Sequence, residues 1–515
     1  MKNLIITLVL SVLYLFSAAQ ADEMEIIWGE PYQSKKSVVT DIISSDDGEI
    51  FAIKRNLGLF NQDIFIERYN NLEPSISTEI KFDQKERFDV MKNIIKLGQD
   101  LWMLNFKTNY DEASLDAHFV DKQTLNPMGE VVPIFDLSIE RRLRYSYGGF
   151  DYVISRDEMK IAFVTQYPGD RDEATALGVQ VHDQRFDLLW ENELTLPYER
   201  QYVELSSIDV SKQGKLFCLL KVYESKEIKG VRKNKSFDYH LISVDANGNQ
   251  TDELIALETG ERIQNLHFEV SENEEVIIAG FFGTGCCTME GTFFMKLDNN
   301  NQLMSSSTEN FAYEFVSEGM TDNQKERLSR EANNGKSMGL DKVDFREFIM
   351  REDGSVVLIG EMFAFQMTPK NAAGDQYPIH FNYKDIVVVS IDPEGRIEWS
   401  KKILKRQLTT EDGGFMSSFV LAVNGDKLHF IYNDHKDNLN IETEKDLNTY
   451  NRKRNNSVVA MVSLDRDGNQ TKEHLIEQKE LGLEIRPQSC QQISANELIL
   501  FGMNKSENLL ARLIF

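Results

Sequence analysis

The residues of this sequence that are best able to do chemistry are its eight histidines, and they are scattered along the chain. They are His118, His182, His240, His267, His380, His429, His435 and His474. A histidine acts as a general base or a metal ligand only where the fold brings suitable partners to it. Several of these histidines stand beside apolar residues in segments typical of strands, which indicates a hydrogen-bonded structural role. His380 and His435 fall on long polar segments, so they are the better candidates for a binding site.

No known catalytic pattern links these histidines to other reactive residues. The sequence contains no H-E-x-x-H, no G-x-S-x-G, no Walker A loop and no dinucleotide-binding glycine fingerprint after a strand. The segment from Asp465 to Asn469 resembles a calcium loop, but Gln470 and Ile476 replace the Gly and Glu that such a loop needs at positions six and twelve. A hairpin turn explains this segment better. We therefore predict no catalytic residues, no bound metal and no cofactor.

Aromatic residues on the polar segments are the remaining binding candidates. Tyr377, Tyr383 and Phe415 could stack on a sugar or anchor a partner protein, together with His380 and His435. The alternative is that these rings pack onto the fold beneath them. Carboxylates are too abundant for the sequence to single out a catalytic pair.

Composition limits the class of protein. Lys2, the apolar run Leu4–Phe16 and Ala19-Gln20-Ala21 have the pattern of an export signal, which predicts a mature chain starting near Asp22. The net charge of −26 disfavours nucleic acids and anionic membrane surfaces as partners. We expect a monomeric protein in the periplasm or at the cell surface, soluble after signal cleavage and not inserted in the membrane.

The four cysteines are too few to form a disulfide framework in an exported chain of this length. Cys218 stands in an apolar strand and is predicted to be a buried thiol. Cys490 precedes another strand, and the pairing of the adjacent Cys286 and Cys287 is left open.

The elements that position these residues are predicted to be strands. Apolar, β-branched runs bounded by Asp/Gly turns recur along the chain, as in Ser355–Phe363 and Asp385–Asp392. Eight such strand pairs can be recognised, from Glu49–Arg55 with Asp63–Asn70 to Glu497–Asn504 with Leu509–Phe515. Four-stranded units repeating in this way are typical of a β-propeller. We predict an all-β fold over residues 22–515, a single propeller of eight blades, with seven as the alternative.

The chain ends predict how the ring closes. The last predicted strand stops at Phe515, so the last blade lacks its outer strand. Glu25–Tyr32 resembles the outer strands around Trp190 and Trp399. The N-terminal strand is therefore predicted to complete the last blade and remove its open edge.

Insertions gather in two classes of connection that emerge on the same face of a propeller blade. The predicted loops include Pro369–Tyr383 and Asp434–Asn456, and the longest insertion is Ser305–Lys342. Within this insertion, Thr321–Gln324 has the pattern of a helix-capping box, and Gly335 follows as a stop signal. One elaborated face usually marks the binding face of a repeat protein.

The segment Phe345–Asp437 resembles exported, uncharacterised proteins of Bacteroidota-type bacteria. The strand pattern also resembles quinoprotein-like and WD40-like propellers in the broad sense. This resemblance implies a propeller in the cell envelope and assigns no catalytic residue. We expect a non-enzymatic module that presents its long-loop face to an envelope protein or a glycan. The alternative is a glycan-active hydrolase or lyase with acidic residues in the axial funnel.

Overall fold

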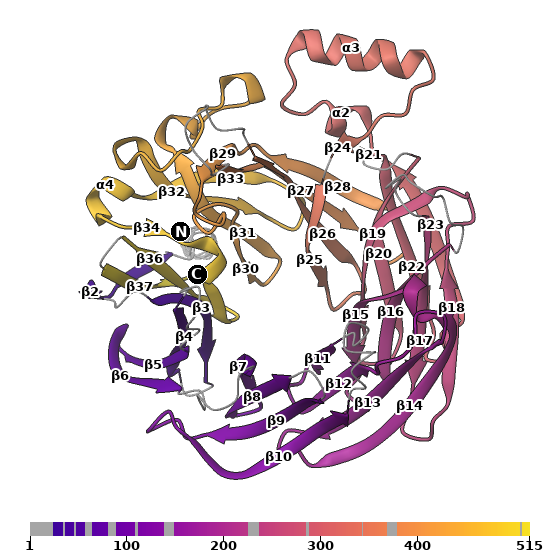
Figure 1. The fold of residues 1–515 in the computed structure, drawn as a ribbon. Coiled ribbons are helices and arrows are strands. Elements are labelled where there is room, and N and C mark those ends of the chain that lie inside the picture. Colours follow the sequence, from indigo (N-terminus) through magenta and orange to yellow (C-terminus); the bar gives the residue numbers. More distant parts are fainter. Residues whose placement is uncertain are drawn as a thin grey trace, which may run out of the picture.

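Eight antiparallel sheets are arranged in a ring in the computed structural model of the protein (Figure 1), and we call the region around the ring axis, onto which the first strand of each blade faces, the channel. The structure describes residues 24–515 except 34–36, 46–47, 57–63, 81–88, 109–111, 139–148, 225–235, 285–287, 342, 368–377 and 505–506. The predicted signal segment 1–21, Tyr377 and the Cys286–Cys287 pair lie outside these residues.

Each of the first four blades has four strands in chain order from the channel outward. Blade 1 consists of β3 (Ser37–Ser44), β4 (Ile50–Asn56), β5 (Ile64–Asn70) and β6 (Glu73–Ile80), and blade 2 of β7 (Asp89–Leu97), β8 (Asp100–Thr108), β9 (Glu112–Val120) and β10 (Pro127–Ser138). Blade 3 consists of β11 (Phe150–Ile154), β12 (Lys160–Gln166), β13 (Ala174–Asp183) and β14 (Leu188–Glu199), and blade 4 of β15 (Val203–Val210), β16 (Leu216–Tyr223), β17 (Phe237–Val244) and β18 (Gln250–Ile255).

Blades 5 to 7 repeat this order with longer connections. Blade 5 consists of β19 (Arg262–Val270), β20 (Val276–Gly283), β22 (Gly291–Leu297) and β23 (Leu303–Asn310). Blade 6 consists of β25 (Val343–Met350), β26 (Val356–Met367), β27 (Ile379–Ile391) and β28 (Ile397–Ile403), and blade 7 of β30 (Val420–Asn424), β31 (Lys427–His435), β32 (Ser457–Leu464) and β33 (Gln470–Glu477). A short strand β29 (Gln407–Thr410) adds to β27.

The eighth blade contains both ends of the chain. Its strands are β34 (Glu484–Ile485), β35 (Gln491–Ser494), β36 (Glu497–Met503), β37 (Glu507–Ile514), β1 (Glu25–Trp28) and β2 (Tyr32–Gln33). Strand β1 pairs antiparallel with β37, from Glu25 opposite Ile514 to Trp28 opposite Ala511. The predicted eight-bladed ring and its closure by the N-terminal strand are both confirmed.

Apolar seams between neighbouring blades form the core. The second and third strands of a blade are buried on both faces because a blade covers each side. In the seam between blades 4 and 5, Phe217 and Leu219 pack with Phe268, Phe282 and Phe293. Outer-strand tryptophans add polar contacts across seams: Trp190 Nε1 donates to the Gly214 carbonyl oxygen at 3.1 Å, and Trp399 Nε1 to that of Arg466 at 2.8 Å.

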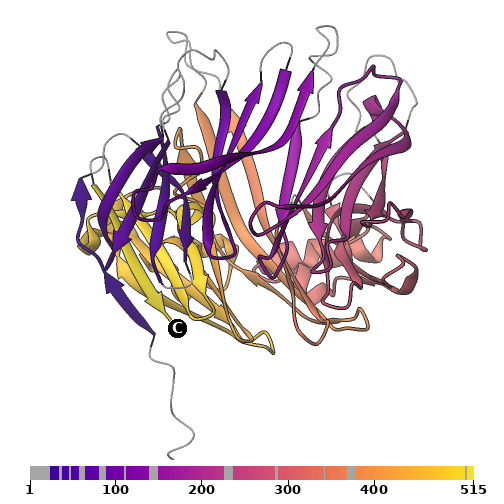
Figure 2. The same ribbon diagram turned by 90° about the horizontal axis from the view of Figure 1, so that it is seen from below.

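Long and short connections separate onto opposite faces of the ring. The first-to-second and third-to-fourth strand turns are tight, whereas the other connections carry the insertions, as the sequence predicts. Figure 2 shows the ring from the side. We call the face with the insertions the long-loop face.

Every helix of the described residues except η5 lies in one of these long connections, and η5 lies between β34 and β35 of blade 8. The longest insertion holds α2 (Tyr313–Val316), α3 (Asp322–Asn333) and the short strand β24 (Leu340–Asp341). Strand β24 pairs with β21 (Thr288–Met289), which lies in the connection between β20 and β22. Thr321 and Gln324 form the predicted capping box before α3, and α3 lies outside the ring in Figure 1. The remaining short helices are α4 (Gln478–Leu481), η1 (Arg200–Tyr202), η2 (Lys436–Asn438), η3 (Glu444–Asp446), η4 (Arg454–Asn456) and η5 (Pro487–Ser489). None of the described helices is long and apolar enough to cross a membrane.

Candidate functional site

The predicted binding residues in the described chain lie on the long-loop face but belong to different environments. The sequence predicts a loop over Pro369–Tyr383, and this is wrong at its end because β27 already begins at Ile379. His380 and Tyr383 are therefore strand residues. His435 is the last residue of β31, and Phe415 stands on the connection between β29 and β30.

Two glycines with positive φ, Gly413 and Gly414, let the chain pass close to the rings of Phe415 and Tyr383. A Cβ at Gly414 would lie 2.8 Å from the Tyr383 hydroxyl, and one at Gly413 would lie 2.7 Å from the Phe415 ring. Tyr383 is only 6% exposed, and the Arg486 guanidinium lies 3.9 Å from the centre of the Phe415 ring. The packing alternative therefore holds for Tyr383, and Phe415 covers a buried arginine.

The two histidines lie at other points of this face, on β27 and at the end of β31. His380 Nδ1 lies 2.8 Å from the Thr410 hydroxyl on β29. His435 Nδ1 accepts a hydrogen bond from the Asp437 backbone N–H at 3.3 Å and caps η2. The first contact joins two side chains on neighbouring strands, and the second caps a backbone turn. That these residues bind a partner stays a prediction.

A buried ionic network supports this part of the long-loop face. Lys405 Nζ donates to Glu361 Oε1 at 2.6 Å and to Gln407 Oε1 at 3.0 Å. Glu361 Oε2 also accepts from the Ser418 hydroxyl at 2.6 Å and lies 3.1 Å from Arg346. Burial lowers the pKa of Lys405, and the Glu361 carboxylate opposes that effect.

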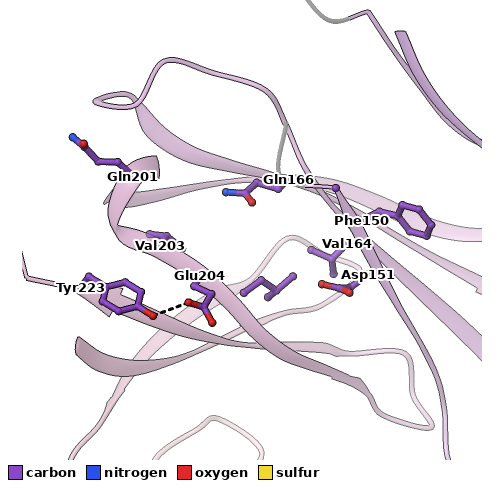
Figure 3. Close-up of a pocket in the computed structure, with 10 residues that line it drawn as sticks. Phe150, Asp151, Val164, Gln166, Gln201, Val203, Glu204 and Tyr223 are labelled. Carbon is purple, nitrogen blue, oxygen red and sulfur yellow. Dashed lines mark hydrogen bonds between the residues drawn. The ribbon is translucent and has the colours of Figure 1, made fainter. Parts of the chain in front are cut away.

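The sequence did not predict a cleft of about 660 Å³ between blades 3 and 4 (Figure 3). Its walls are the long-loop ends of β11, β12, β15 and β16 together with η1, where Gln201 lies. Val203 and Leu205, both partly buried, supply an apolar strip above the fully buried Val164. Phe150, although at its edge, packs against Phe106 and Phe135 of blade 2.

Polar side chains with unused hydrogen-bonding groups border this cleft. The side chains of Asp151 and Gln166 make no hydrogen bond or ion pair with the described part of the chain. The Asp151 carboxyl is exposed to the cleft, and desolvation by the surrounding walls raises its pKa. A ligand would therefore meet one carboxyl and one amide that are still free to bind it.

Glu204 is held differently from Asp151. Its Oε2 accepts a hydrogen bond from the Tyr223 hydroxyl at 2.6 Å (Figure 3), and its Oε1 lies 3.5 Å from Lys221. Burial, and then the bond to Glu204, raise the pKa of Tyr223 to about 12. The phenol therefore stays protonated and acts as a donor over the physiological pH range.

A second cavity, of about 390 Å³, opens on the channel near the short-turn face. Arg156, Asp209 and Glu269 come to it from three successive blades. Burial raises the pKa of Asp209 to about 6 and that of Glu269 to about 7. Asp209 accepts hydrogen bonds from the Val210 and Val270 backbone N–H groups, so it also joins blades 4 and 5.

The described residues contain no cluster suited to a metal ion, and their free cysteines are buried. No group of three or more His, Cys, Asp and Glu side chains in the described chain could hold a metal ion. Asp465 accepts hydrogen bonds from the Asp467 and Asn469 backbone N–H groups, which explains that segment as a turn. Cys218 is the predicted buried thiol, 1% exposed, and burial raises its pKa to about 12.

Comparison with known proteins gives likeness of fold only. No protein-family model and no curated protein matches the sequence. The WD40 domain of SCAP from fission yeast is similar over 97% of this chain and 96% of its own, at 8% identity and a TM-score of 0.41. The polysaccharide lyase Uly1 is similar over 97% and 94%, at 11% identity and a TM-score of 0.36. A member of the duf4221 family from Bacteroides vulgatus is similar over 89% and 100%, at 9% identity and a TM-score of 0.32. What this chain does must therefore be argued from its own residues.

Proposed function

We propose that the protein is an exported glycan-binding module whose ligand enters the cleft between blades 3 and 4 from the long-loop face. The free polar groups of Asp151 and Gln166 on that cleft carry the proposal. The signal-type N-terminus supports export to the periplasm or cell surface, and the net charge of −26 argues against a nucleic-acid ligand.

The chemistry of the cleft suits a polyhydroxylated ligand. Sugar hydroxyls both donate and accept hydrogen bonds, so they can donate to the Asp151 carboxylate and exchange both kinds of bond with the Gln166 amide. The exposed parts of Val203 and Leu205 can cover the C–H face of a sugar ring. A volume of about 660 Å³ lies within the range of small-molecule sites.

The contacts of Glu204 stabilise one conformation of its side chain. One Glu204 oxygen accepts a hydrogen bond from Tyr223, and the other lies 3.5 Å from Lys221. The Glu204 side chain is 52% exposed, so a sugar hydroxyl in the cleft can still donate to its oxygens.

A glycan hydrolase or lyase is the second candidate, and the unequal environments of two carboxyls favour it. The pKa of Asp151 is raised by desolvation, whereas Glu204 is paired with Lys221. Such a difference can separate a general acid from its partner carboxylate. Asp209 and Glu269 in the channel offer a second carboxyl pair.

Calorimetric titration with neutral, acidic and amino oligosaccharides tests the proposal. We expect saturable binding, at least tenfold weaker in Gln166→Ala and in Asp151→Ala, because each change removes a direct hydrogen bond. Gln250→Ala is the matched control, since Gln250 is an exposed glutamine on the outer strand of blade 4. Absence of binding at millimolar sugar, or variants that bind as the wild type does, would contradict the proposal.

The same ligands distinguish the hydrolase or lyase. The binding-module proposal predicts intact oligosaccharide after prolonged incubation, as checked by mass spectrometry. Cleavage that is lost in Asp151→Asn while affinity is retained would establish the enzyme in its place.

A further inference from the structure

The central hairpin of blade 6 extends beyond the inner strand of its own blade. Pairing between β25 and β26 ends at Val343 opposite Met362, but β26 continues to Met367. On its other side, β26 stays paired with β27 up to Met367 opposite Ile379. The segment Phe363–Met367 therefore has an open edge among the described residues.

The opposite edge of this extension is closed. Strand β29 pairs with β27 from Gln407 opposite Tyr383 to Thr410 opposite His380. The Leu408 N–H in turn donates to the Tyr450 carbonyl oxygen at 2.9 Å. The extension is thus a three-stranded sheet that offers its unpaired N–H and C=O groups along Phe363–Met367.

Apolar side chains cover one face of this three-stranded extension. Side chains at alternate positions share a face, and cross-strand partners share it too. Phe363, Phe365 and Met367 therefore lie with their partners Tyr383, Phe381 and Ile379. Phe365 is 62% exposed and Met367 57%, the two highest values among the large apolar side chains of the described chain.

The open edge lacks the usual protection against pairing. Natural edge strands carry charges, prolines or bulges that prevent another strand from adding. Phe363–Met367 reads Phe-Ala-Phe-Gln-Met, without charge or proline, in a chain of which 27% is charged. An edge that is both apolar and unprotected suits a strand-shaped partner.

We propose that β26 at Phe363–Met367 accepts an extended peptide segment of a partner protein as an added strand. The main-chain groups of the edge would bind the peptide backbone, and alternate apolar side chains of the peptide would cover Phe365 and Met367. Because each copy of this chain carries a net charge of −26, a neutral or basic partner is favoured over a second copy. This site is separate from the cleft between blades 3 and 4.

Selection from a displayed library of random octapeptides, followed by fluorescence polarisation with the enriched peptide, tests this assignment. We expect enriched sequences that alternate apolar and polar residues, with micromolar affinity. The same peptide with alternate backbone amides N-methylated should bind at least tenfold more weakly, because it loses main-chain donors but keeps its side chains. Bound peptide should also slow amide exchange in residues 363–367.

Protein variants locate the binding edge. Phe365→Ser with Met367→Ser should weaken the enriched peptide at least tenfold, whereas Met304→Ser should not. Met304 is 56% exposed on the outer strand β23 of blade 5, so it matches the exposure of Met367. Circular dichroism and unfolding curves establish that each variant folds.

Four results would overturn the proposal. They are the absence of any enriched peptide, equal binding of the N-methylated peptide, equal binding by the Phe365→Ser, Met367→Ser variant, and concentration-dependent dimerisation of the wild type that this variant abolishes. The last result would assign the edge to a second copy of the chain.

Discussion

Lys405 and Glu361 form an ion pair that is fully withdrawn from solvent beneath the long loops of blade 6. Lys405→Met would leave the buried Glu361 carboxylate with Arg346, at 3.1 Å, as its remaining ion-pair partner among the described residues. We predict a loss of about 3–5 kcal/mol in the free energy of unfolding, the range for breaking a buried pair from one side, as measured by urea denaturation. Lys427→Met, at an exposed lysine on β31, should change stability by less than about 0.5 kcal/mol.

Adding Glu361→Gln to Lys405→Met separates charge burial from packing. If the uncompensated charge causes the loss, the neutral amide should restore part of the stability. No recovery, or a single-variant loss below about 1 kcal/mol, would contradict the assigned role of this ion pair.

Glu269 predicts a pH-dependent effect in the channel. Its folded pKa of about 7 lies above the ordinary value of 4.5 because of burial, so the folded state binds the extra proton between those values. Protonation of Glu269 should therefore raise the free energy of unfolding of the wild type as pH falls from 8 towards 4.5. This stabilisation should be lost as pH rises through 7. Glu269→Gln should stabilise the protein by about 1–2 kcal/mol at pH 8 and by almost nothing at pH 4.5. Unfolding curves of the wild type and of Glu269→Gln at both pH values measure this difference. An equal effect of the substitution at pH 8 and pH 4.5 would contradict the raised pKa of Glu269.

Residue types explain why the sequence did not reveal the cleft. Asp151, Gln166 and Glu204 stand at strand ends and look like ordinary solvent-facing residues in a chain with 83 acidic residues. They meet only because blades 3 and 4 are neighbours in the ring. The predicted aromatic candidates were chosen by their position in polar segments, and that criterion does not distinguish a packed ring such as Tyr383 from an exposed one such as Phe365.

At the scale of elements, α3 is predicted to be locally weak. None of its side chains is buried, and it depends on the capping box at Thr321 and Gln324. Thr321→Ala should cost about 1 kcal/mol of local helix stability, so amide exchange in residues 322–333 should be roughly fivefold faster. Global unfolding should be unchanged within about 0.5 kcal/mol. A fall in global stability equal to the local loss would show that α3 is part of the cooperative core.

Element types were predictable where local chemistry determines them. The Asp392 carboxylate accepts hydrogen bonds from the Glu394 and Arg396 backbone N–H groups. Because these contacts are local, the Pro393–Gly395 turn could be predicted from the sequence. The extension of β27 to Ile379 was not predicted, because Tyr377-Pro378 suggests a loop and the pairing with β29 joins residues about 30 positions apart. Non-local pairing of this kind has no short-range signature.

For the whole molecule, ring closure by β1 should dominate stability. Removing residues 22–33 would leave the β37 edge open and uncover Leu510, Ala511 and Leu513, which pack in the seam around Trp28. We expect a decrease of more than 10 °C in the melting temperature, together with association through the exposed edge. Calorimetry and light scattering measure both. A truncated chain that melts as the full chain does and stays monomeric would contradict closure by the N-terminal strand.

The proposed function places ligand binding on the long-loop face, at blades 3 and 4. Hydrogen–deuterium exchange with and without a saturating oligosaccharide, identified by the titrations, tests it most directly. We predict slower exchange confined to residues 149–154, 164–166 and 201–205, the segments that border the cleft. Protection at the short-turn cavity around Asp209 and Glu269, with none at the cleft, would contradict ligand binding between blades 3 and 4.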